Sequence, residues 1–209
     1  MLNLTEAVKT AERCQRNWDH SKPVSEEDVK KIVEVATTMP TKQNRLFYEL
    51  IVSTNPKFNR TCYEYSIDPN NEHFKDRKVH RNTQVDAPLL LMWRTTDQTK
   101  VEATDYFKDR YEKNFIMSIG ISSGAAVLTA NSLGYRTGYC QCFEIKDLFK
   151  KLENDFNLPQ NNNAPFQEGL IVGIGNPNSN YNRVDCVIDD EHGYTAETIN
   201  KKVNTIYVK

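Results

Sequence analysis

The sequence lacks an excess of charge of either sign. Its 209 residues contain 27 lysines and arginines against 28 aspartates and glutamates, which gives a formal net charge of −1. Proteins that bind nucleic acid or a membrane surface through general electrostatics carry a strong basic excess. We therefore expect neither nucleic acid nor a membrane among the partners of this chain.

The sequence also lacks a secretory leader and an even set of cysteines. Its first residues, MLNLTEAVKTAER, are charged and amphipathic, without an apolar core or a small-residue cleavage site. The five cysteines, at positions 14, 62, 140, 142 and 186, cannot all pair with one another. We expect reduced thiols in a cytoplasmic protein.

Several motifs that would point to a metal or a dinucleotide are missing. Cys140 and Cys142 have no second cysteine pair and no nearby histidine, so structural thiols are the better interpretation and no metal is expected. The GIGNP sequence at 173–177 lacks the G-x-G-x-x-G spacing of a dinucleotide fingerprint. Without repeats or a flexible linker, residues 1–209 are expected to form a single domain.

Apolar periodicity predicts a mixed α and β class. Helical spacing occurs at 4–13 and again after Ser25, where an acidic first turn begins a helix that Pro40 ends. A charged helix is expected at 102–113 and a short one at 144–152. The segment 55–84 is polar, which favours a loop with one short helix. Strands are predicted at 47–54, 87–94, 136–143, 169–177 and in the tail at 204–209.

From Phe115 to Tyr135 the sequence has no charged residue. The length would suit a membrane span, but the many serines, glycines and other small polar residues favour a helix that is buried on most sides within protein. Small residues also let a neighbouring backbone approach closely, in a core or at a subunit interface.

Two polar stretches are candidates for ligand binding. In RCQRNWD, Arg13 and Arg16 are three positions apart and could hold one anion, since arginine makes bidentate bonds to phosphate. A solvated helix end is the commoner alternative for such a basic pair. The TKQN stretch, 41–44, lies between a helix end and a strand, where ligand-binding groups often occur. Its alternative is a plain connection.

Together these stretches resemble the FMN-dependent nitroreductase family. Members of that family have a basic-Ser-x-basic-x-aromatic element, a Pro-Val pair before a helix, and a Pro-Ser-x-x-Asn loop before the first core strand. The matching positions here are RCQRNW at 13–18, PV at 23–24 and PTKQN at 40–44. An Ala-Pro strand start, the uncharged helix and GIGNP follow in the same order, so the resemblance covers about residues 5–185.

The resemblance implies an α+β sandwich with a mixed, mostly antiparallel sheet flanked by helices. It also implies an intertwined homodimer with two FMN sites at the subunit interface. The uncharged helix would be the main dimer contact, and the tail, about 186–209, would reach over the partner subunit.

The resemblance further implies which residues bind the FMN phosphate. Arg13 and Arg16 would hold it, with Cys14 and Gln15 beside it and Arg183 as a further cation. Cys14 stands where the family has serine, which replaces a strong hydroxyl donor with a weak thiol donor.

Other residues would approach the flavin ring. Asn82 and Gln84 are candidates for its polar edge, and Gln141 and Cys142 for its reactive face, where the family has an acidic residue and glycine. The second subunit would contribute Pro40, Thr41, Lys42 and Asn44.

The implied activity is that of an FMN-dependent NAD(P)H oxidoreductase. NADH or NADPH would reduce the flavin at N5, and a nitroaromatic, quinone or similar acceptor would reoxidise it by a ping-pong scheme. No side chain is assigned a catalytic role. The alternatives are a reductive dehalogenase or flavin-fragmenting enzyme of the same superfamily, an FMN-binding or redox-sensing protein with little turnover, and a flavin-free interaction protein.

Overall fold

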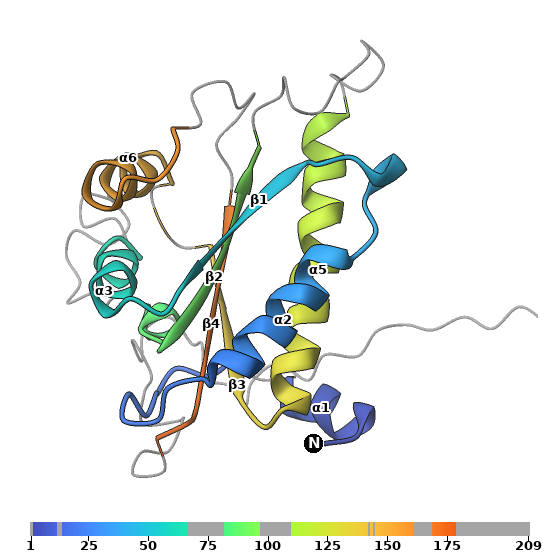
Figure 1. Ribbon diagram of the computed structural model, residues 1–209, viewed down its shortest axis with the longest axis vertical. Coiled ribbons are helices and arrows are strands. Elements are labelled where there is room, and N and C mark those ends of the chain that lie inside the picture. Colours follow the sequence, from blue (N-terminus) through green and yellow to red (C-terminus); the bar gives the residue numbers. More distant parts are fainter. Residues whose placement is uncertain are drawn as a thin grey trace, which may run out of the picture.

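A four-stranded sheet forms the middle layer of the protein (Figure 1). The computed structural model describes residues 2–11, 14–66, 82–96, 110–141, 143, 145–160 and 169–178. The strand order is β1-β2-β4-β3, and every pairing among these strands is antiparallel. The strands are β1 (Tyr48–Ser53), β2 (Leu89–Thr95), β3 (Arg136–Cys140) and β4 (Gly169–Gly175).

Helices cover both faces of the sheet (Figure 1). On one face lie α1 (Leu4–Ala11), α2 (Glu26–Thr38) and α5 (Tyr111–Ser132), and on the other α3 (Pro56–Glu64) and α6 (Ile145–Phe156). Two 3-10 turns, η1 (Lys42–Asn44) and η3 (Thr83–Val85), precede β1 and β2. The α+β sandwich predicted from the resemblance is therefore confirmed.

The central strand β2 explains how the two cores form. Its residues alternate between the two faces, so that Leu91 and Trp93 pack with α2 and α5 while Leu90 and Met92 pack with α3 and α6. All seven residues of β2 are buried. A strand covered on both faces is continuously apolar, and the prediction of a central strand at 87–94 is confirmed.

Local signals set the helix ends largely as predicted. The Asn3 side chain accepts a hydrogen bond from the Glu6 N–H at 3.0 Å, and the Glu6 side chain accepts one from the Asn3 N–H at 3.1 Å, which caps α1. Ser25 caps α2 by accepting from the Asp28 N–H at 3.2 Å, and the helix ends two residues before Pro40.

The short helix expected in the polar segment after β1 is present as α3, which buries Phe58 and Cys62 in the core. Two element ends need correction. The strand β3 ends at Cys140 rather than at residue 143, and α6 continues to Phe156, beyond the expected end. Most of the expected helix at 102–113 and the tail strand lie outside the described residues.

Helix α5 is buried on one side only, not on most sides. Its Ser122 hydroxyl donates to the Ala36 carbonyl at 2.6 Å and accepts from the Trp93 indole at 2.8 Å, which fixes the helix to α2 and β2. Helix α5 is long enough and apolar enough to cross a membrane, with a mean hydropathy of 1.3 over an 18-residue stretch. Half of that stretch is buried inside the protein. Ile116, Met117 and Ile121 are about half exposed.

We expect Asp28 to make the fold sensitive to acid. The Ser25 and Tyr135 hydroxyls both donate to its carboxylate at 2.8 Å, and these bonds, the Ser25 bond first, lower the pKa of Asp28. A carboxyl whose pKa is lower in the folded state stabilises the protein above its unfolded pKa, and this stabilisation is lost as pH falls through the folded pKa.

Asp28→Asn should therefore lower the Tm by a few degrees at pH 7 and reduce the fall of Tm in acid, below about pH 4. The exposed Glu26 in the same turn gives the control Glu26→Gln, which should retain the wild-type pH profile. Identical profiles for Asp28→Asn and wild type would contradict the prediction.

Candidate functional site

The stretch that follows α1 lies against β3 and the end of β4. The Gln15 N–H donates to the Thr137 carbonyl at 2.7 Å, and Trp18 forms a strand-like bridge with Pro177. The Asn178 N–H donates to the Asn17 carbonyl at 3.2 Å. These bonds fix the backbone that carries Arg16.

Three glycines bring this stretch and η3 onto the sheet. Gly138 and Gly173 are opposite each other in the β3–β4 register. A Cβ on Gly138 would lie 2.5 Å from the Gln15 carbonyl oxygen, and a Cβ on Gly173 would overlap the Gln84 carbonyl. A Cβ on Gly175 would lie 2.7 Å from the Pro88 ring and 3.2 Å from the Trp18 ring. The absence of side chains at these positions creates the space that the site occupies.

We expect Gly173→Ala to disrupt this part of the molecule. The new methyl group would meet a backbone carbonyl, which cannot rotate aside as a flexible side chain could. Overpacking of this kind destabilises a protein by about 1–3 kcal/mol. Chemical denaturation measures the effect, and a variant with wild-type stability would show that η3 does not lie against β4.

Asn82 and Gln84 are brought together with the stretch 14–18. Both side chains are buried, and the Asn82 amide nitrogen donates to Gln84 Oε1 at 2.8 Å and to Cys140 Sγ at 3.2 Å. The Gln84 N–H donates in turn to Asn82 Oδ1 at 3.0 Å. Because Asn82 engages the oxygen end of the Gln84 amide, the nitrogen end is the one left to meet a ligand.

Unsatisfied donors gather in the same region. Among the described residues, Arg16 Nη1, Asn17 Nδ2 and Thr83 Oγ1 are buried side-chain atoms that have no hydrogen-bond partner. A buried polar group without a partner costs about 1–3 kcal/mol, and native proteins leave few of them. A guanidinium edge, an amide and a hydroxyl, all three able to donate, fit an anionic, acceptor-rich group such as a phosphate. The residues present therefore fit the phosphate of FMN.

The other residues predicted to bind the FMN phosphate or the flavin ring differ in position and burial. The Gln15 amide donates to the Asn17 carbonyl and so stabilises the stretch itself. Cys14 is a half-buried free thiol beside Tyr139, and burial raises the pKa of that tyrosine. Gln141 is exposed directly after β3. The predicted Arg13, Cys142 and Arg183 lie outside the described residues.

The other predicted group lies at the opposite edge of the sheet. Its residues precede β1, whereas the stretch 14–18 adjoins β3, and the strand order separates these two strands. They are Pro40, Thr41, Lys42 and Asn44. One chain therefore does not bring the two predicted groups together.

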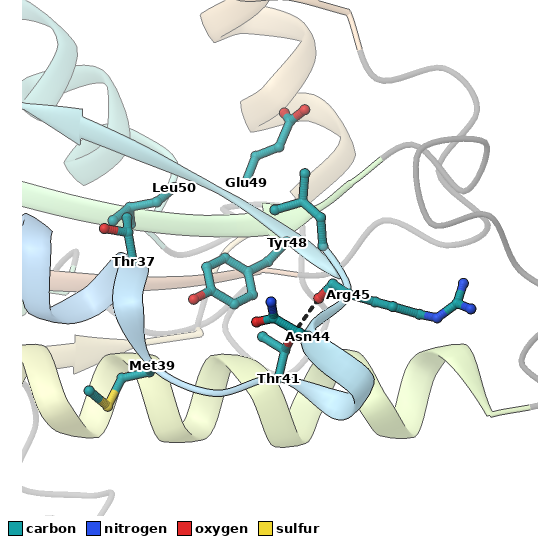
Figure 2. Close-up of a pocket in the computed structure, with 9 residues that line it drawn as sticks. Thr37, Met39, Thr41, Asn44, Arg45, Tyr48, Glu49 and Leu50 are labelled. Atoms are coloured by element: carbon teal, nitrogen blue, oxygen red, sulfur yellow. Dashed lines mark hydrogen bonds between the residues drawn. The ribbon is translucent and has the colours of Figure 1, made fainter.

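Two residues of this second group, Thr41 and Asn44, line a hollow of about 380 Å³ (Figure 2). The Thr41 hydroxyl donates to the Arg45 carbonyl at 2.6 Å, while the Arg45 guanidinium points away from the other labelled side chains. Gln43 and Asn44 have φ values of 54° and 55°. Left-handed backbone at a glutamine is uncommon, and such strain is concentrated in functional loops.

A further hollow, of about 880 Å³, lies between α2, α3 and the start of β2. Its lining carries both charge signs, including Lys30, Arg60 and Asp86, and contains none of the predicted site residues. Among the described residues, no cluster of three histidine, cysteine or acidic side chains could hold a metal ion.

Sequence reasoning missed Asn17 and Thr83. Asn17 lies inside RCQRNWD, and Thr83 lies between two predicted residues, but nothing in either position marks a buried donor. Their role as unsatisfied donors depends on the contact between the two segments, where the Trp18 indole donates to the Thr83 carbonyl at 2.8 Å.

Comparisons with known proteins identify the family and the fold of this chain. The family model described as "Nitroreductase family" matches residues 11–175. A nitroreductase with bound FMN from Bacteroides fragilis has a TM-score of 0.65 at 14% identity, with all of both chains covered. A BluB-like flavoprotein from Clostridium difficile also scores 0.65, at 16% identity, with 87% of this chain and 93% of that chain covered.

A nitroreductase family protein from Clostridium novyi has a TM-score of 0.61 at 14% identity, with 88% of this chain and 91% of that chain covered. At such identities the solved structures establish the fold. Among curated proteins, none has a matching sequence.

Proposed function

The chain belongs to the nitroreductase family, and from this premise we propose that it is an FMN-dependent NAD(P)H oxidoreductase that reduces quinones, nitroaromatic compounds or similar acceptors. The observation that carries the proposal is the group of buried, unpartnered donors around Arg16, in the region that the family model matches. The FMN bound to the solved relative from Bacteroides fragilis supports the same cofactor.

Each group of residues has its own part in the proposal. When bound, FMN supplies the hydride chemistry, taking a hydride from NADH or NADPH at N5 and delivering it to the acceptor. Arg16 binds the phosphate end through charge-assisted hydrogen bonds. Gln84, oriented by Asn82, offers a donor to the polar edge of the ring, where negative charge develops on reduction. The protein thus binds and orients the cofactor.

We propose a homodimer because the site is incomplete in one chain. The Thr41–Asn44 loop and the stretch 14–18 lie at opposite edges of the sheet, so a second subunit must bring the loop to the flavin. Helix α5 offers a surface for this contact. Ile116, Met117 and Ile121 are exposed beside Gly120 and Gly124, where a Cβ would meet open space. An exposed apolar surface of this kind is typical of an interface.

Two further proposals rest on the sequence alone. The tail, about 186–209, would reach over the partner subunit, and it lies outside the described residues. The odd number of cysteines, five, supports a cytoplasmic location.

Steady-state kinetics test the proposed function. With FMN-loaded protein, the rate of NADH or NADPH oxidation is measured at several fixed concentrations of a quinone and of a nitroaromatic acceptor. If the electron donor and the electron acceptor bind the same site in turn, the double-reciprocal plots should give parallel lines. A flavin-loaded protein without turnover would indicate a binding or sensing protein instead, and converging lines would contradict the shared site.

A further inference from the structure

Thr83 carries a hydroxyl group that the fold buries and does not satisfy. Its Oγ1 atom has no hydrogen-bond partner, whereas its carbonyl accepts both from the Trp18 indole at 2.8 Å and from the Asp86 N–H at 3.2 Å. Two hydrogen bonds therefore hold the backbone of Thr83 in place. A hydroxyl in this condition lowers stability unless a ligand meets it.

Thr83 lies against the stretch that carries Arg16. Trp18, which reaches Thr83, is two residues from Arg16, and alternate residues of an extended stretch share a side. That stretch is held in an extended course by its bonds to Thr137 and Asn178. Arg16 Nη1 is likewise buried and without a partner. Two segments that contact each other thus each carry an unsatisfied hydrogen-bond donor, and the donor on Arg16 is cationic.

The acidic side chain of the same stretch, Asp19, already has other partners. The Asp19 carboxylate accepts from the Ser21 hydroxyl at 2.6 Å and pairs with Lys22 at 2.9 Å. These bonds, the Ser21 bond first, lower the pKa of Asp19 to about 2. The Asp86 carboxylate lies 4.0 Å from His20.

We infer that Thr83 is a ligand-binding residue that donates its hydroxyl to the same phosphate monoester as Arg16. This inference rests on the proposed function for the identity of the ligand, FMN, and assigns a residue that neither the sequence motif nor the family resemblance identified. The pair makes binding depend on the phosphate group, so FMN is bound in preference to riboflavin.

A set of threonine variants tests the inference. Thr83→Val removes the hydroxyl at nearly constant shape, so it should raise the Tm of the protein without ligand and weaken FMN binding by about tenfold. Riboflavin affinity should stay at the wild-type value. Thr83→Ser keeps the hydroxyl and should bind FMN as the wild type does.

Thr96→Val is the matched control. Thr96 Oγ1 is also buried without a partner, but it follows β2 at the end of the sheet that adjoins Phe47, away from the stretch 14–18. The Tm of this variant without ligand should rise as it does for Thr83→Val, and its FMN affinity should stay at the wild-type value. A Thr83→Val protein with unchanged FMN affinity, or with equal losses for FMN and riboflavin, would overturn the inference.

A titration with inorganic phosphate separates this inference from the proposed function. Phosphate should raise the Tm of the wild type and of Thr83→Ser, and should raise that of Thr83→Val much less. If the wild type binds no FMN, the proposed function is wrong, and the phosphate titration still decides on Thr83. A phosphate response that is the same in Thr83→Val as in the wild type would then overturn the inference.

Discussion

Arg16→Ala should weaken FMN binding by about 10- to 100-fold, because a charge-assisted hydrogen bond contributes about 1.5–3 kcal/mol. One nitrogen of its guanidinium is buried and has no hydrogen-bond partner, so it is a donor that a phosphate could satisfy. Removing an unsatisfied group should cost the ligand-free protein little stability. Quenching of flavin fluorescence on binding measures the affinity.

Arg60→Ala is the control for this prediction. Arg60 is an exposed cation on α3 that pairs with Glu64 at 3.4 Å, so its loss changes the net charge equally and leaves the site intact. This variant should bind FMN as the wild type does. Riboflavin, which has no phosphate, should bind Arg16→Ala and wild type alike. If Arg16→Ala keeps its FMN affinity, the phosphate does not bind at this stretch.

Ile121→Lys should convert the proposed dimer to monomers and reduce FMN affinity in the same step. Ile121 is 45% exposed in one chain and lies on the open side of α5. Burying a lysine there without a partner would cost several kcal/mol. Because the Thr41–Asn44 loop would be supplied by the second subunit, a monomer would lack part of the site. Sedimentation velocity gives the oligomeric state, and a flavin titration gives the affinity.

Val52→Lys introduces the same charge at another exposed apolar position, in β1, where Val52 is 38% exposed. It should remain dimeric and bind FMN normally. Two outcomes would contradict the proposal: an Ile121→Lys protein that remains dimeric, or a monomer that retains wild-type FMN affinity.

The parts of the fold that depend on local patterns were predictable from the sequence. Ser25 with its acidic first turn, and Pro40 beyond the other end, locate α2 because caps and proline act within a few residues. The continuous apolar run in β2 predicted its central position because a strand covered on both faces carries apolar residues on both. Helix α3 was less visible because its buried face consists of few apolar residues, Phe58 and Cys62 among them.

The sequence indicated the candidate site only where a motif marked it. RCQRNWD indicated Arg16, and the resemblance indicated Asn82 and Gln84. The unsatisfied hydroxyl of Thr83 and the close approach at Gly138 and Gly173 arise from contacts between segments far apart in the chain. A single sequence does not contain these distances. The division of the predicted residues between two sheet edges likewise follows from strand order, which periodicity does not give.

The most direct test of the account is an absorbance spectrum of the purified protein after incubation with FMN and removal of free flavin. Under anaerobic conditions the protein is then titrated with NADH and, separately, with NADPH. We predict bound flavin whose visible bands bleach with at least one of the two nucleotides. Protein that retains no flavin after this treatment would contradict the assignment of Arg16 and its neighbours as a cofactor site, and with it the proposed function.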